Sequence, residues 1–180
     1  MSNSATSLNM HLLTIYLRAN THNYGVDSAM DLEIPTTAQD CVCLAVRQAA
    51  RHVTQFYDRM LAPSGLRTTQ FSLLAKLRRQ GPTTINALAA DMVMDRTTLG
   101  RNILPLERDR LLRIEVAACD RRSKVVHLTK RGEARLIAAF KGWAEAQACF
   151  ESTFGSRRAA ELRALLRAVA ATGLGPGGRS

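Results

Sequence analysis

The feature that most constrains this chain is a change in the spacing of its apolar residues midway along the sequence. Ile85, Leu88 and Met92 recur every three or four residues, which is typical of one face of a helix. Asp95 then precedes a second such stretch, 96–110, and aspartate is a residue type that caps helices at their N-terminus. Two short helices separated by a brief break predict a helix-turn-helix.

Directly after this pair of helices the apolar spacing falls to two. Leu112, Ile114 and Val116 alternate with polar residues, which predicts a strand. A second strand is expected at 125–128, and the segment between them, 117–124, reads as a hairpin tip with three basic residues. A helix-turn-helix followed by a basic hairpin is a strong combined signal of DNA binding.

Long helices flank this central part on both sides. The apolar spacing predicts one helix over 36–62, whose long apolar stripe needs a long partner to lie against. Thr129 precedes another helix, 130–154, and a last one is expected over 156–171. The predicted fold class is therefore mainly α with a small β-hairpin, and 36–172 form the folded part.

The two ends of the chain lack this periodicity. Residues 1–35 are rich in Ser, Asn and Thr and predict a loosely ordered extension, with a short helix at 10–18. The glycine-rich residues 173–180 predict a flexible tail. A chain of 180 residues is expected to form one domain with a proper core.

The charge of the chain indicates its partner. A formal net charge of +10 points to a polyanion, with nucleic acid the first candidate and an anionic membrane surface the second. Eleven basic and five acidic residues between 96 and 135 place a net charge of +6 on the second helix of the pair, the hairpin and the following turn. A helix fits the major groove of DNA, and a basic hairpin tip fits the adjacent minor groove. The side chains expected to contact bases and phosphates are Arg96, Thr97, Thr98, Arg101, Asn102, Arg121, Arg122 and Lys124.

Several other classes of protein are excluded. The chain has no Gly-x-Ser-x-Gly, His-Glu-x-x-His, P-loop or Gly-x-Gly-x-x-Gly motif and its histidines are scattered, so we expect no enzyme, cofactor or metal site. No run approaches the roughly 18 apolar residues of a membrane span, and no signal peptide is expected. Cysteines without a Cys-x-x-Cys pair favour a reducing cytoplasm. A non-specific architectural DNA-binding protein is the alternative, because it would explain the charge although not the hairpin.

The segment from Thr84 to Thr129 resembles the MarR family of bacterial winged-helix repressors, and the resemblance extends over about 38–171. It is most specific at Met94-Asp95-Arg96-Thr97-Thr98-Leu99 and at Asp120-Arg121-Arg122 followed by Leu128-Thr129. The resemblance implies a winged helix-turn-helix DNA-binding lobe, about 68–129, between dimerisation helices at about 36–62 and 130–171.

The same resemblance implies a homodimer that binds an imperfect palindrome in double-stranded DNA. Two-fold proteins generally contact half-sites on the order of 34 Å apart. In this family an acidic residue pairs with an arginine of the hairpin, so Asp120 is expected to position Arg122, with a simple role in the hairpin turn as the alternative. The family often has glycine directly before the Met-Asp pair, whereas this chain has Val93.

The sequence leaves two kinds of switch open, and the first is a thiol. The stretch from Cys43 to Tyr57 looks like the organic-hydroperoxide-sensing branch of the family, in which the cysteine is reactive and the tyrosine positions it. A second tyrosine of that branch is Thr68 here. The alternative is that Cys43 is a small buried apolar residue. Arg47 and Arg51 would either lower the pKa of a nearby thiol or bind a carboxylate or phosphate.

The second kind of switch is a small aromatic or anionic ligand. The resemblance implies that such a ligand binds between the dimerisation helices and the DNA-binding lobe and releases the repressor from DNA. Aromatic residues at helical spacing are more often part of a core than of a ligand site. The candidate lining residues are Arg47, Arg51, Phe56, Tyr57, Phe71, Phe140 and Trp143.

Overall fold

The computed structural model describes residues 41–117 and 120–172. The chain divides into two units, Met1–Val42 and Cys43–Ser180, and the fold below is that of the second unit. The predicted extension at 1–35, with its short helix at 10–18, and the predicted tail at 173–180 lie outside the described residues.

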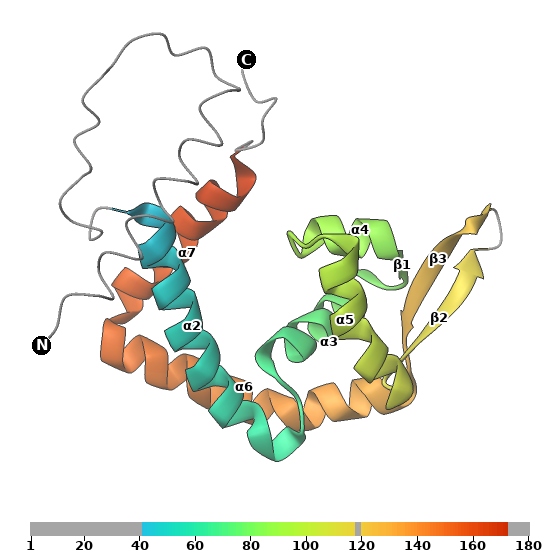
Figure 1. The fold of residues 1–180 in the computed structure, drawn as a ribbon. Helices are drawn as coiled ribbons and strands as arrows, with labels where there is room; N and C mark the ends of the chain where they lie inside the picture. Colours follow the sequence, from blue (N-terminus) through green and yellow to red (C-terminus); the bar gives the residue numbers. More distant parts are fainter. Residues whose placement is uncertain (1–40, 118–119, 173–180) are drawn as a thin grey trace, which may run out of the picture. The chain divides into compact units, whose positions relative to one another are not determined.

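The first described helix is α2 (Val42–Leu61), within the helix predicted at 36–62. Pro63 follows in a single 3-10 turn, η2 (Ala62–Ser64), and Gly65 then adopts a φ of +73° that favours glycine. These residues end α2 and reverse the chain into α3 (Thr68–Gln80), which packs against the later helix α6 (Figure 1).

The two short helices of the predicted helix-turn-helix are α4 (Ile85–Asp91) and α5 (Arg96–Arg108). The Thr84 hydroxyl accepts a hydrogen bond from the Ala87 backbone N–H at 3.1 Å and so caps α4. The turn that joins the helices passes through Val93, whose φ is +52°. The predicted helix pair is therefore confirmed, with a left-handed residue at its turn.

A three-stranded antiparallel sheet follows, with the order β1-β3-β2. Its strands are β1 (Thr83–Thr84), β2 (Leu112–Ala117) and β3 (Asp120–Leu128). The second strand of the hairpin was predicted at 125–128. The predicted start was wrong, because β3 begins at Asp120 and includes most of the segment that was expected to form the hairpin tip. The two-residue strand β1 was not predicted.

Two helices complete the fold, α6 (Lys130–Phe154) and α7 (Ser156–Ala171), with the predicted bounds. The Thr129 hydroxyl accepts a hydrogen bond from the Gly132 backbone N–H at 3.0 Å and donates toward the carbonyl oxygens of Arg110, at 2.8 Å, and Leu111, at 3.0 Å. A Cβ at position 132 would clash with the Leu111 carbonyl oxygen, so glycine allows this close approach. The start of α6 is thus fixed to the chain that leaves α5.

One hydrophobic core joins these elements. Among the described residues, the largest fully buried side chains come from α2, α3, α4, α5 and the sheet; they are Leu61, Leu73, Leu74, Leu77, Leu88, Leu99, Ile103, Leu106, Leu112 and Val126. Burial of these side chains fixes α5 and the β2–β3 hairpin relative to α3. No helix within 41–117 or 120–172 is long and apolar enough to cross a bilayer.

Candidate nucleic-acid interface

The helix α5 presents a row of polar side chains at its exposed N-terminal half. Arg96, Thr97, Thr98 and Arg101 are exposed, and Asn102 is half-buried. Residues three and four apart are neighbours on a helix, so Thr98 lies beside Arg101 and Asn102. The structure therefore brings together the residues that the sequence predicted on this helix, and, after that prediction, we call them the DNA-reading row.

Asp95 fixes the start of this row. Its carboxylate accepts a hydrogen bond from the Thr98 backbone N–H at 2.8 Å and another from the Thr98 hydroxyl at 2.6 Å. The hydrogen bond from the hydroxyl, and next the one from the backbone, hold the pKa of Asp95 below its ordinary value. Because the hydroxyl proton is directed to Asp95, Thr98 offers a partner its methyl group and an oxygen acceptor.

The other members of the row differ in how much of their hydrogen-bonding capacity is used. The Asn102 amide donates to the Thr98 carbonyl oxygen at 2.8 Å. Within the described part of the chain, Arg96 and Arg101 form no ion pair. Guanidinium groups without a partner suit bidentate contacts to guanine or to phosphate oxygens.

Strands β2 and β3 form a ribbon beside α5 (Figure 1), in which Val116 pairs with Lys124. Arg122 and Lys124 are exposed on β3, close to a shift in the pairing register between Val116 and Ala117. The side chains of Asp120 and Arg121 lie outside the described residues. The positioning of Arg122 by Asp120 therefore stays a prediction.

The two residues of the predicted thiol switch lie far apart on α2. Cys43 is exposed, while Tyr57 is buried and its hydroxyl donates to Gln147 Oε1 at 2.8 Å. Burial raises the pKa of Tyr57, the Glu151 carboxylate raises it further, and Arg163 opposes this. Fourteen residues of helix separate Cys43 from Tyr57 by about 21 Å. Within one chain this distance is too long for the tyrosine to contact the thiol, so the positioning of Cys43 by Tyr57 stays a prediction that would need a second copy.

A pocket of about 400 Å³ lies between α3 and α6. The rings of Phe71 and Trp143 stack with their centroids 5.9 Å apart, and the Phe140 ring lies 5.3 Å from that of Trp143. Arg78 and Arg79 complete the lining of the pocket. The pocket therefore offers aromatic faces together with guanidinium groups.

Four of the predicted ligand residues do not line this pocket, and Tyr57 is one of them. Arg47 and Arg51 are exposed on α2, and Phe56 packs edge-on against the neighbouring tyrosine at 5.6 Å. Sequence reasoning missed Arg78, although its spacing of seven from Phe71 places both on one face of a helix. Among the described residues, no group of His, Cys, Asp or Glu side chains could hold a metal ion.

Comparison with known proteins gives matches among solved structures. No family model matches the chain, and no curated protein sequence matches it significantly. The chain is similar to the M. tuberculosis transcriptional regulator MosR in complex with DNA, with 40% identity and a TM-score of 0.64, covering 73% of this chain and 98% of MosR. It is also similar to a second crystal structure of MosR, at 37% identity and a TM-score of 0.64, covering 76% of this chain and all of MosR.

The fold is shared with a more distant protein. BpsR of Bordetella bronchiseptica, whose DNA binding is regulated by 6-hydroxynicotinic acid, is 24% identical with a TM-score of 0.67, covering 77% of this chain and 99% of BpsR. This chain therefore covers nearly the whole length of these three structures.

Proposed function

Because this chain belongs to the MarR family of DNA-binding transcriptional regulators, which are not enzymes, we propose that it is a homodimeric cytoplasmic repressor released from an imperfect palindrome by a small ligand. The observation that carries the proposal is the DNA-reading row on a capped helix, beside a basic ribbon. Contacts from the row would select bases, while contacts from the ribbon would hold the backbone and minor groove.

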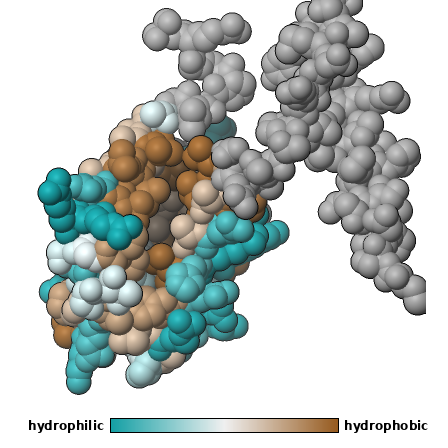
Figure 2. Space-filling model, turned by 90° about the vertical axis from the view of Figure 1, so that its left-hand side faces the viewer, coloured by the Kyte–Doolittle hydropathy of each residue, from teal (hydrophilic) through white to brown (hydrophobic). Residues whose placement is uncertain are grey.

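The apolar face on α2 and α7 supports the homodimer. Val46 is 41% exposed on α2, and Leu165, Leu166 and Val169 are 66%, 44% and 50% exposed on α7. Val46 and Leu166 line a groove of about 520 Å³ between α2, α6 and α7. Figure 2 shows apolar side chains gathered around a hollow on this side of the molecule. Exposed apolar patches of this kind mark interaction sites, and a second copy brings the same patch to cover it.

The pocket between α3 and α6 supports release by a small aromatic anion. Its stacked Phe71 and Trp143 suit an aromatic ring, and Arg79 suits a carboxylate. Arg78 is already 3.4 Å from Glu133, so Arg79 is the guanidinium expected to meet the ligand. The pocket joins α3 of the DNA-binding lobe to α6, so a ligand there would act on the spacing of two lobes in a dimer.

The test of DNA recognition is fluorescence anisotropy with DNA from upstream of the protein's own gene and with a scrambled duplex. Arg101→Ala is expected to change which duplexes are preferred, since a bidentate base contact contributes about 1–3 kcal/mol of discrimination. Arg122→Ala is expected to weaken binding to every duplex and to lower the salt slope by about 1. Arg59→Gln, which removes an exposed charge at the end of α2, is the matched control.

Two results would contradict the proposal. Equal affinity of the unmodified protein for palindromic and scrambled duplexes would favour the architectural alternative. A molar mass of one subunit in light scattering would contradict the proposed homodimer. It would also mean that something other than a second copy covers the apolar groove. Leu165→Glu, on the exposed apolar face of α7, is expected to shift a dimer toward the monomer.

The thiol alternative stays a prediction, with its own test. An organic peroxide is added to the repressor–DNA complex, and Cys43→Ser is compared with the unmodified protein. Release of DNA from the unmodified protein alone would favour the thiol switch over the ligand. Release by an aromatic carboxylate that is lost in Arg79→Gln would favour the pocket between α3 and α6.

A further inference from the structure

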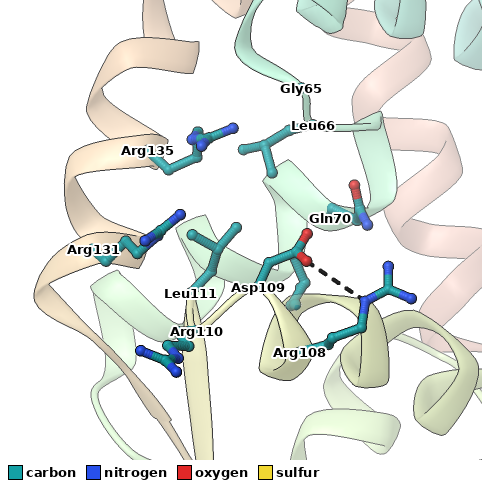
Figure 3. A pocket seen from close by; sticks show the side chains of 10 residues that line it. Gly65, Leu66, Gln70, Arg108, Asp109, Arg110, Leu111, Arg131 and Arg135 are labelled. Atoms are coloured by element: carbon teal, nitrogen blue, oxygen red, sulfur yellow. Dashed lines mark ion pairs between the residues drawn. The ribbon is translucent and has the colours of Figure 1, made fainter.

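A second pocket, between the end of α5, the start of α6 and the chain that enters α3, carries a concentration of positive charge. Its volume is about 410 Å³, which lies in the range of small-molecule sites. Four arginines and one aspartate line it, a net charge of +3. Figure 3 shows Arg131 and Arg135 extending from α6 toward the centre, with Arg108 on the opposite side. The charged side chains of this arginine pocket are Arg108, Asp109, Arg110, Arg131 and Arg135.

Most of this charge has no counterion among the residues that the structure describes. Arg108 Nε lies 3.6 Å from Asp109 Oδ1, a loose and exposed ion pair. Within 41–117 and 120–172, neither Arg110 nor Arg131 forms an ion pair. Guanidinium groups gathered without counterions repel one another, and a bound anion would reverse that repulsion.

The stability of the helices accounts for only part of the cluster. Arg108 ends α5, where the negative end of the helix dipole favours a cation. Arg131, in contrast, lies in the first turn of α6, where the positive end of the dipole disfavours one. The helix dipole therefore does not account for a cation at this position.

Two backbone features shape the site around these groups. The Arg135 Nη1 atom donates to the Ser64 carbonyl oxygen at 2.8 Å, which uses one of the five guanidinium donors. A Cβ at Gly65 would lie 3.0 Å from the same atom, so glycine leaves room for it. Arg110 has a φ of +59°, in the region where L residues are rare. This residue ends α5 with the two hydrogen bonds of a Schellman motif: the Arg110 N–H donates to the Glu107 carbonyl and the Leu111 N–H to the Leu106 carbonyl, each at 2.8 Å, so the conformation belongs to the helix end.

We propose that the arginine pocket binds a small molecule bearing a diphosphate group. The planar guanidinium fork matches phosphate oxygens with two parallel hydrogen bonds, and a ligand with several negative charges suits a net charge of +3. The other source of phosphate is the DNA backbone, and the position argues against it. Arg108 lies twelve residues after Arg96, about 18 Å further along α5 and away from the DNA-reading row.

The test is isothermal titration calorimetry of the full chain with sodium pyrophosphate, without DNA and at constant ionic strength. We expect saturable binding to one site per chain. Arg110→Gly and Arg131→Gln should each raise the dissociation constant at least about tenfold, because each removes charge-assisted hydrogen bonds. Arg110→Gly also relieves the strained φ, so a loss of binding cannot be ascribed to unfolding. Arg59→Gln, outside the pocket, should bind as the unmodified protein does.

Three outcomes would overturn the proposal. The first is the absence of saturable heat, or equal binding in all variants. The second is weaker pyrophosphate binding in Arg101→Ala, which would place the anion on the DNA-reading row. The third is a loss of operator affinity in Arg110→Gly and Arg131→Gln without pyrophosphate binding in the unmodified protein, which would assign the pocket to DNA phosphates. Unchanged operator affinity in both variants, together with lost pyrophosphate binding, supports a free small molecule.

Discussion

Replacing Val93 with glycine is expected to make the protein more stable. Helix α4 ends with the two hydrogen bonds of a Schellman motif: the Val93 N–H donates to the Ala90 carbonyl at 3.0 Å, and the Met94 N–H donates to the Ala89 carbonyl at 2.9 Å. This motif requires a left-handed residue, and Val93 provides it with a φ of +52°. A β-branched residue is among the least suited to this conformation.

The magnitude follows from three contributions. The left-handed conformation costs an L residue roughly 1–2 kcal/mol, and glycine removes that cost. Glycine adds roughly 0.5–1 kcal/mol of backbone entropy lost on folding. The Val93 side chain is 76% exposed, so little burial is lost. The net expectation is a gain of about 0.5–1 kcal/mol in the free energy of unfolding, or about 1–4 °C in Tm.

Urea unfolding, followed by the fluorescence of the single tryptophan, measures this change at equal protein concentrations. The matched control is Val116→Gly, since Val116 is 58% exposed but lies in strand β2 without a positive φ. That variant is expected to be less stable by about 0.5–1 kcal/mol. A destabilised Val93→Gly variant, with the same sign as Val116→Gly, would refute the left-handed turn.

The remaining predictions concern the core, the start of α6 and the cap of α5. Leu74→Ala should lower the free energy of unfolding by about 2–5 kcal/mol, because Leu74 is fully buried; a smaller loss in urea unfolding would mean a loose core. Gly132→Ala should cost about 1–3 kcal/mol by the same measurement through its clash with Leu111, whereas an unchanged midpoint would contradict that close approach. The lowered pKa of Asp95 means that its cap stabilises the fold at neutral pH and is lost as the pH falls through that pKa. The stability difference from Asp95→Ala should therefore hold from neutral pH down to about pH 4 and shrink at lower pH, and a difference that shrinks already above about pH 5 would contradict the lowered pKa.

The sequence predicted those parts of the fold whose signals are local. Asp95 marked the start of α5, Thr129 that of α6, and the alternation from Leu112 to Val116 marked β2. The early part of β3 was missed because 120–124 are mostly charged or polar and show no alternation of apolar residues. Strand β1 was missed because two residues carry no period, and it forms only by pairing with β3.

The candidate sites also differ in whether their residues are close together in the sequence. The DNA-reading row was predictable because its members share one helix and one cap. The arginine pocket was not, since Arg108 and Arg135 meet only after the hairpin has brought the end of α5 to the start of α6. In the sequence these arginines were counted only as part of a basic stretch.

The attachment of α6 at Thr129 and Gly132 has a mechanical consequence. A helix of 25 residues is about 37 Å long, and its first turn is held to the chain leaving α5. A tilt of about 5° at the far end of such a rod displaces the held end by about 3 Å. In a dimer whose copies meet through their terminal helices, α6 would act as a lever arm, so that a small rearrangement near the two-fold axis would shift both DNA-reading helices out of step with the duplex.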